Sequence, residues 1–431
     1  MKVLMFGWEF PPHISGGLGT ACYGLTKGLN SLHNLEIIFV VPKAYGDEDQ
    51  SAVRVVGAGD VSVKRKRFNY SEVWKDITYI EVGSLLIPYT TPEEYQNQLT
   101  DHYAISSDHV ETDELGRISF SGKYGPNLMQ EVSNYAIIAS VIAQQYDFDV
   151  IHAHDWMTYA AGIAAKKASG KPLVIHVHAT EFDRSGENVN QQVFDIERAG
   201  MINADKIITV SNLTRSIVIE RYGINPDKVV TVYNAVEPNQ PALEPKKYER
   251  TLDEKIVTFL GRITFQKGPE YFVEAAHMVL QRKSNVRFVM AGSGDLFNRM
   301  VKRAAELGIG SKFHFTGFLK GEEVDKMFAL SDVYVMPSVS EPFGISPLEA
   351  MRSNVPVIIS KQSGVAEILQ HAIKVDFWDV NAIADAIYGL ITYDALSSMF
   401  RQYGKDEVDK LKWENAAYHV KEVYDSVVRK H

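Results

Sequence analysis

Short apolar runs alternate along the chain with longer segments in which apolar residues recur every three or four positions. The short runs are rich in Val and Ile, which is typical of strands buried on both faces of a parallel sheet. The longer segments are typical of helices that bury one side. This alternation predicts an α/β protein with two doubly wound parallel sheets. The predicted strands are Val3–Phe6, Val150–Ala153, a run from Leu173, Ile207–Val210, Val229–Val232, Ile256–Leu260, Val286–Met290, Val333–Met336 and Val355–Ile359.

The length of the chain predicts two domains. Its 431 residues exceed the size at which single hydrophobic cores stop growing. A Pro-containing segment, 237–245, is the predicted hinge, so we expect a first domain at 1–240 and a second at 241–413. Residues 45–126 are less regular and are interpreted as an elaboration of the first domain. After Trp413, apolar residues at helical spacing predict a last amphipathic helix.

Two loops of the second half carry charged residues at the ends of predicted strands. Arg262 and Lys267 follow Ile256–Leu260, and Glu341 follows Val333–Met336. The second loop leads into a helix that we expect Ser346 to open, with Pro347 at the first helical position. A helix N-terminus at the carboxyl edge of a sheet is suited to a diphosphate, which the two cations would also bind.

The two carboxylates of this region, Glu341 and Glu349, would be repelled by a diphosphate. They are therefore better suited to hydroxyl groups or to positive charge that develops on a sugar. The alternative is that Ser346 and Glu349 form a capping box without any ligand. The corresponding alternative for Arg262 and Lys267 is that they are ordinary solvated charges of a loop.

Glycine pairs follow two further predicted strands. Gly292 and Gly294 come after Val286–Met290, where a phosphate or a ribose would lie. Gly16 and Gly17 come before the first helix and would allow a ligand to approach the backbone closely; a surface turn is the alternative. The segment 7–19 lacks the Gly-x-Gly-x-x-Gly spacing of dinucleotide-binding proteins, so NAD is not expected.

Two His-x-His pairs end neighbouring strands of the first half: His152 with His154, and His176 with His178. They make a metal centre a rival interpretation, although the spacing marks out no complete ligand set, and Asp155 and Glu181 are the carboxylates nearest in sequence. The acidic triplet 147–149 precedes its strand and is expected at the opposite sheet edge. We therefore predict no metal site.

Taken in order, Arg262, Lys267, Glu341 and Glu349 resemble the donor site of retaining glycosyltransferases of the GT-B fold, which has two facing Rossmann-like domains. Families 4 and 5 of these enzymes, which include glycogen and starch synthases and sucrose-phosphate synthases, carry a Gly-Arg and Lys-Gly segment and a Glu-x7-Glu motif. The sequence His-Ala-His-Asp-Trp at 152–156 is similar to a glycogen-synthase motif. In one respect the chain departs from the synthases, since Ile14 replaces the Lys of their Lys-x-Gly-Gly-Leu segment.

This resemblance implies the roles of individual residues. His154, Arg262, Lys267 and Glu341 would be catalytic, with His154 against the transferred sugar and Glu349 on the ribose. Residues 414–431 would complete the first domain, and Asn234 would face the cleft, unless it only forms a turn. The implied donor-binding set is Gly16, Gly17, Gly292, Gly294, Phe343, Gly344, Ile345, Ser346, Leu348 and Glu349. No cofactor is implied, because the nucleotide-sugar is a substrate.

Composition narrows the possible partners. The net charge of −9 disfavours nucleic acid and anionic membranes, so local cations must bind an anionic donor. The chain has one cysteine, Cys22, which we expect to pack in the first helix, and no apolar run of membrane-spanning length. A cytoplasmic protein is therefore expected.

The resulting hypothesis is a transferase that moves glucose from ADP- or UDP-glucose to a glycan, most simply an α-1,4-glucan. The alternatives are a family 4 enzyme with another sugar or a lipid-linked acceptor, a metal-dependent hydrolase, and a non-catalytic binder of sugar nucleotides. Tyr89, Tyr95 and Tyr124 are candidates for stacking on acceptor sugars, although ordinary loop tyrosines are the favoured interpretation. The oligomeric state stays open.

Overall fold

The computed structural model describes residues 1–14, 16–62, 112–236 and 253–429. These residues divide into two compact units: residues 1–62, 112–234 and 413–429 form the first, and residues 235–236 and 253–412 form the second. The predicted domain boundary at residue 240 lies outside the described residues, as do Tyr89 and Tyr95. Each unit is an α/β domain with a parallel sheet, as the alternation of patterns predicted.

The described part of the first unit contains a seven-stranded parallel sheet in the order β3-β2-β1-β4-β5-β6-β7. Apolar residues fill most of its central strands, and β4 and β5 are buried along their whole length. The strands are β1 (Lys2–Phe6), β2 (Glu36–Val41), β3 (Arg54–Gly57), β4 (Val150–His154), β5 (Leu173–Val177), β6 (Lys206–Thr209) and β7 (Val229–Thr231).

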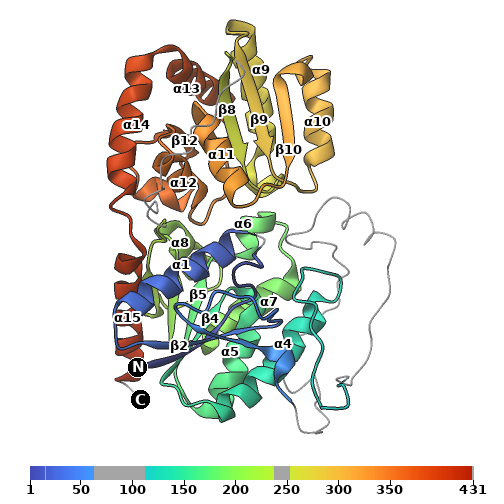
Figure 1. The fold of residues 1–431 in the computed structure, drawn as a ribbon, viewed down its shortest axis with the longest axis vertical. Helices are drawn as coiled ribbons and strands as arrows, with labels where there is room; N and C mark the ends of the chain where they lie inside the picture. Colours follow the sequence, from blue (N-terminus) through green and yellow to red (C-terminus); the bar gives the residue numbers. More distant parts are fainter. Residues whose placement is uncertain (15, 63–111, 237–252, 430–431) are drawn as a thin grey trace. The chain divides into compact units, whose positions relative to one another are not determined.

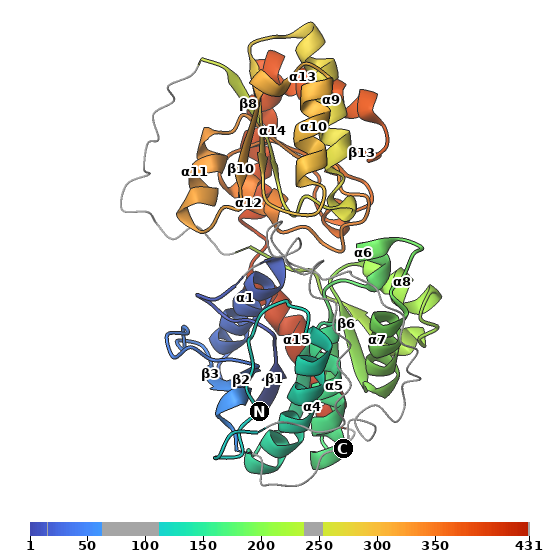
Figure 2. The same ribbon diagram turned by 90° about the vertical axis from the view of Figure 1, so that its right-hand side faces the viewer.

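Helices cover both faces of this sheet (Figures 1 and 2). Helices α1 and α15 pack on each other, and α5 packs against both α4 and α7. The C-terminal helix α15 is therefore part of the first unit, and the hydroxyl of its buried Tyr424 lies 2.5 Å from His152 Nδ1 of β4. The helices are α1 (Gly17–Ser31), α4 (Leu128–Gln145), α5 (Trp156–Ser169), α6 (Glu181–Ser185), α7 (Gln191–Asn203), α8 (Asn212–Glu220), α15 (Trp413–Val428) and the 3-10 turns Ala58–Asp60 and Pro226–Lys228.

The second unit contains, in its described residues, a six-stranded parallel sheet in the order β10-β9-β8-β11-β12-β13. A cluster of aromatic rings from Phe259, Phe272, Phe288 and Phe313 joins the sheet to α9 in its core. The strands are β8 (Lys255–Leu260), β9 (Val286–Ala291), β10 (Phe313–Gly317), β11 (Val333–Met336), β12 (Val357–Ser360) and β13 (Ile373–Val375). The helices are α9 (Pro269–Arg282), α10 (Phe297–Glu306), α11 (Glu322–Leu330), α12 (Ser346–Arg352), α13 (Val380–Thr392), α14 (Asp394–Val408) and the 3-10 turns Phe265–Lys267, Gly310–Lys312 and Gly364–Glu367.

Each sheet has one point where the strand order reverses. The reversal lies between β1 and β4 in the first unit and between β8 and β11 in the second. Loops that leave two such strands diverge to opposite faces of the sheet and open a crevice at its carboxyl edge, where ligands of doubly wound proteins bind. Among the described residues, no helix is both long and apolar enough to cross a membrane.

Candidate functional site

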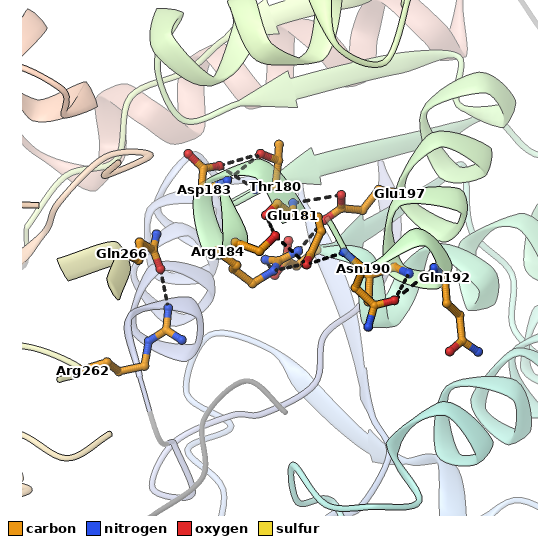
Figure 3. Close-up of polar contacts among 12 residues, drawn as sticks. Thr180, Glu181, Asp183, Arg184, Asn190, Gln192, Glu197, Arg262 and Gln266 are labelled. Carbon is orange, nitrogen blue, oxygen red and sulfur yellow. Dashed lines mark hydrogen bonds and ion pairs between the residues drawn. The ribbon is translucent and has the colours of Figure 1, made fainter. Parts of the chain in front are cut away.

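The reversal point of the second sheet brings together two residues that are 74 positions apart in sequence. Lys267 lies in the loop after β8 and Glu341 in the loop after β11, and Lys267 Nζ is 2.5 Å from Glu341 Oε2. The Glu341 side chain is 9% exposed and that of Lys267 is 20% exposed, so the pair borders solvent on the lysine side. In the same loop as Lys267, Arg262 Nη2 donates a hydrogen bond to Gln266 Oε1 at 2.8 Å (Figure 3).

Backbone hydrogen bonds fix the position of this ion pair. The N–H of Val339 donates to the carbonyl of Gln266 at 2.9 Å, which ties the loop after β11 to the loop after β8. Glu341 is held on both sides, since its N–H donates to Gln362 and its carbonyl accepts from Gly364. Side chains that stand on such tied loops keep their geometry without a ligand, which is a property of preorganised sites.

Two glycines let these loops touch one another through their backbones. Gly268 has a φ of 63°, and a Cβ atom there would lie 2.1 Å from the carbonyl oxygen of Pro337. Gly292, in the loop after β9, has a φ of 137°, and a Cβ atom there would lie 1.9 Å from the carbonyl oxygen of Gly261. Because any side chain would separate the loops, only glycine permits this close approach.

The start of α12 differs from the prediction. Ser346 is the first helical residue and Pro347 the second, and the residue at the N-cap is Ile345, which makes no side-chain capping bond. The capping-box interpretation of Ser346 and Glu349 is therefore wrong. The hydroxyl of Ser346 instead lies 2.8 Å from the hydroxyl of Tyr334, which also donates to the Leu260 carbonyl at 3.2 Å.

The other predicted donor-binding residues of this region differ in how far their side chains are exposed. The side chains of Phe343 and Leu348 are buried in the second unit, so they offer a ligand backbone atoms only. Glu349 is half-buried, and this burial raises the pKa of its carboxyl while Arg352 lowers it. Gly344 turns the chain with a φ of 102° beside the Glu341 side chain.

At the reversal point of the first sheet, four histidines form one cluster of imidazole rings. His154 ends β4 and pairs in register with His176 of β5. Neighbouring rings among His152, His154, His176 and His178 have centroids 4.2 to 5.5 Å apart. Burial lowers the pKa of all four imidazoles, in the case of His178 to about 3, so the cluster is neutral at pH 7.

The same cluster supplies the atoms that a metal ion needs. The ligand atoms of His152, His154 and His176 lie within 4.8 Å of one another, and so do those of Cys22, His154 and His178. The sequence showed the two pairs but not that all four rings meet, because their separation depends on the register of β4 and β5. Cys22 is buried as expected, and this burial raises the pKa of its thiol.

The remaining candidates of the first unit differ in their exposure to solvent. Gly16 is the N-cap residue of α1 and has an extended backbone. A Cβ atom on Gly17 would have none of the atoms considered within 4 Å. Tyr124 is buried with its ring 6.4 Å from that of Trp8, so it cannot stack on a sugar. Asn234 is buried as well.

The acidic triplet lies at the other sheet edge, as expected. Asp149 accepts a hydrogen bond from the backbone of Lys2 at the start of β1, and Asp147 pairs with the Lys2 ammonium at 3.3 Å. These contacts occupy the amino ends of β1 and β4, whereas His154 lies at the carboxyl end of β4. The triplet therefore does not contribute to the histidine site.

A buried ionic cluster behind His154 was not found from the sequence. Asp155 follows His154 with a φ of 63°, and its carboxylate is 3.9 Å from the Arg184 guanidinium. Arg184 also lies 3.2 Å from Glu181 and contacts Glu197 (Figure 3). Its neighbours Thr180 and Asp183 form the capping box of α6. One cation thus faces three buried carboxyl groups, an arrangement that depends on how α6 and α7 pack.

Because three buried carboxyl groups share one cation, the protonated forms of these carboxyl groups are favoured. Burial raises the pKa of Asp155 to about 6 and that of Glu197 to about 8, although Arg184 lowers both. The folded protein therefore holds a proton on Glu197 that the unfolded chain releases above about pH 4.5. The stability that results is complete below that pH and is lost as the pH rises through about 8.

We expect the free energy of unfolding to fall between pH 5 and pH 8, with a limiting slope of about 1.4 kcal/mol per pH unit for each proton released. In Glu197→Gln this slope should shrink, because the amide cannot titrate. Urea unfolding at several pH values measures it. Glu187→Gln is the matched control, since Glu187 pairs with Arg221 on the surface. Equal slopes in the wild type and Glu197→Gln would contradict the assignment.

The chain is similar to known proteins over its whole length. Residues 242–407 match the family Glycosyl transferases group 1, and residues 104–240 match Glycosyltransferase Family 4. An uncharacterized glycosyltransferase of Methanocaldococcus jannaschii is 30% identical, with 98% of each chain covered. The glycogen synthase of Mycobacterium tuberculosis is 22% identical over 98% of this chain and 94% of its own.

A solved structure shows the same architecture. The Anabaena protein HepE, crystallised in complex with UDP and glucose, superposes with a TM-score of 0.66 at 16% identity and covers 99% of this chain and 100% of its own. Two doubly wound α/β domains, together with this similarity to a solved structure, place the chain in the GT-B class of proteins. The chain belongs to the glycosyltransferases of this class, of the family 4 and family 5 type.

Proposed function

We propose that this glycosyltransferase moves a glucosyl unit from ADP- or UDP-glucose to a glycan, with retention of the anomeric configuration. The observation that carries the proposal is the Lys267–Glu341 pair at the reversal point of the second sheet. A cation at that point faces the place where doubly wound domains bind phosphates. A neighbouring carboxylate suits the sugar that the phosphates carry.

In this proposal the second unit binds the donor. Lys267 and Arg262 stabilise the negative charge that develops on the β-phosphate when the bond to the sugar breaks. Fixed charges in such a site act more strongly than in water and need no rearrangement during the reaction. The loop with Gly292 and Gly294 approaches the nucleotide through its backbone, as do Phe343–Ser346 and Leu348.

The two carboxylates have separate roles in the proposal. Glu341 accepts hydrogen bonds from the sugar hydroxyls, and Glu349 accepts them from the ribose. When the donor binds, Lys267 is shared between Glu341 and the pyrophosphate, so the ion pair seen here weakens. As the bond between the anomeric carbon and the diphosphate breaks, the acceptor hydroxyl oxygen forms the new bond to that carbon on the same face, and the hydroxyl proton passes to the departing diphosphate.

The first unit contributes His154 in this proposal, as a hydrogen-bond partner of a sugar hydroxyl. The His154 side chain has no exposed surface, and its carbonyl accepts a hydrogen bond from the Thr158 hydroxyl at 2.9 Å. Its neutral imidazole suits a hydroxyl better than a phosphate, because it carries no charge. Gly16 and Gly17 would let the donor approach the start of α1.

The preferred acceptor is an α-1,4-glucan, which the similarity to a glycogen synthase over nearly the whole chain supports. Ile14, in place of the lysine of the synthases, favours instead a family 4 enzyme that uses another sugar or a lipid-linked acceptor. The two possibilities differ in whether glycogen accelerates turnover of the donor.

A donor screen with and without glycogen tests the proposal. We expect release of nucleoside diphosphate from ADP-glucose or UDP-glucose, faster with glycogen and unchanged after treatment with a chelator. Donor turnover that glycogen does not accelerate would favour another acceptor. Binding of donors without any turnover would contradict the enzyme assignment. Activity that a chelator abolishes would favour a metal-dependent reaction at the histidine cluster.

A further inference from the structure

Three buried imidazoles of β4 and β5 have ring nitrogens that make no hydrogen bond. His152 and His154 are 0% exposed and His176 is 2% exposed. Within the described part of the chain, Nε2 of His152, Nε2 of His154 and both ring nitrogens of His176 are buried and have no partner. A buried polar atom without a partner destabilises a fold, so these nitrogens are suited to a group that they bind together.

The second nitrogen of two of these rings is already held. His152 Nδ1 lies 2.5 Å from the hydroxyl of Tyr424, and His154 Nδ1 lies 3.0 Å from His178 Nε2. When each Nδ1 donates its proton in these bonds, each Nε2 carries the lone pair. Histidines that bind metal ions have this arrangement, because a bond from the other nitrogen fixes the tautomer and the orientation of the ring.

The three rings are also close enough to share one ion. The ligand atoms of His152, His154 and His176 lie within 4.8 Å of one another. This proximity comes from the sheet, since His154 pairs in register with His176. Imidazole nitrogens suit Zn²⁺, whereas Mg²⁺ and Ca²⁺ take oxygen ligands. His178 is partly exposed, so it marks the side of the cluster from which an ion enters.

Cys22, His154 and His178 form a rival set, because their ligand atoms also lie within 4.8 Å of one another. An ion held by that set would bind His178, whose Nε2 already shares a hydrogen bond with His154. The set of three buried imidazoles leaves that bond and the bond to Tyr424 intact. The geometry therefore favours His152, His154 and His176 as the ligands.

We propose that His152, His154 and His176 bind one Zn²⁺ ion, and that this ion inhibits the enzyme and is not its cofactor. With Nδ1 bonded to His178 and Nε2 on the ion, His154 has no nitrogen left for a sugar hydroxyl. The inhibition, but not the binding, rests on the proposed function, in which His154 contacts the sugar. The sequence did not predict this site, because only the register of β4 and β5 brings in the third ring.

Titration of the metal-free protein with Zn²⁺ and with Co²⁺ tests the binding. Calorimetry should show one ion per chain, and zinc should raise the temperature of unfolding, because it binds the folded state. The cobalt protein should show no thiolate-to-cobalt charge-transfer band. Tyr424→Phe, which removes only the partner of a ligand, should weaken zinc binding about 10-fold, and His176→Gln, which removes a ligand, more than about 100-fold.

His419→Ala and Cys22→Ser are the matched controls and should bind zinc like the wild type. His419 lies exposed on α15 and pairs with Glu422, and Cys22 belongs to the rival set. Thermal unfolding without metal shows whether each variant is folded. Absence of stoichiometric binding, or equal affinity in the wild type and folded His176→Gln, would overturn the site. A charge-transfer band that Cys22→Ser abolishes would assign the ion to the rival set and overturn the ligands named here.

Release of nucleoside diphosphate at increasing Zn²⁺ concentration tests the inhibition. Turnover should fall as the site fills and return when a chelator is added, and the same zinc concentrations should inhibit folded Tyr424→Phe less. Zinc that binds without lowering turnover would overturn the inhibition. If the metal-free wild type turned over no donor, the proposed function would fail, and the calorimetric titration would still decide whether the metal site exists.

Discussion

Replacing Lys267 by Ala is expected to lower kcat/KM about 100- to 1,000-fold, the loss typical of removing one charge-stabilising group from an active site. Lys267 is the cation nearest to the buried carboxylate of Glu341, and we place it against the departing diphosphate. Because the charge develops mainly in the transition state, most of the loss should appear in kcat. Release of nucleoside diphosphate at saturating and at low donor concentration measures both constants.

The substitution also leaves Glu341 without its cation, and an unpaired buried carboxylate destabilises a fold. The double variant Lys267→Ala with Glu341→Gln removes this charge, so it should regain stability without regaining activity. Lys302→Ala is the matched control in the same unit, since Lys302 is exposed and lies 3.9 Å from Glu306. Near-normal turnover in folded Lys267→Ala would count decisively against the donor site proposed here.

The second large effect is expected for Gly292→Ala. The new Cβ atom would lie 1.9 Å from the Gly261 carbonyl oxygen, and the φ of 137° is one that L residues rarely adopt. The three nearest atoms are all backbone atoms of Gly261, so they cannot move aside like a flexible side chain. We expect the free energy of unfolding to fall by about 2 to 5 kcal/mol, from backbone strain and overpacking together. Urea or thermal unfolding measures it.

Activity should fall along with stability, because the displaced loop leads away from β9 beside the loop that carries Arg262. Gly310→Ala is the matched control: the nearest atom to its Cβ would be 3.9 Å away. It should leave both properties within the error of the measurement. If Gly292→Ala were as stable as this control, the close contact of the two loops would be disproved.

Most of the fold was predictable because the sheets are parallel and buried. A strand covered on both faces is mostly apolar along its length, so β4, β5, β8 and β9 are visible as short, mainly apolar runs. The strands β2, β3, β10 and β13 were not predicted. β3, β10 and β13 are edge strands that are only partly buried, so their sequences carry a weaker apolar signal. β2 is buried along most of its length and was missed although its sequence is apolar.

The candidate site was predictable to different degrees in the two units. Lys267 and Glu341 could be found because each follows a recognisable strand, and carboxyl ends of parallel strands share one edge. The start of α12 was predicted one residue late, since Ile345 is the N-cap residue and the hydroxyl of Ser346 is hydrogen-bonded to the hydroxyl of Tyr334. A hydrogen bond to a side chain of the preceding strand leaves no mark in the local sequence.

By itself, then, the sequence determined the parallel α/β architecture, the two strand-end loops with their charges and the resemblance to glycosyltransferases, because these depend on local patterns. Only the tertiary structure decided that Lys267 pairs with Glu341, that Arg184 faces three carboxyl groups, and that His178 is the more exposed partner of His154. Those contacts depend on sheet order and register. Both are set by packing between segments far apart in the chain, which no local pattern records.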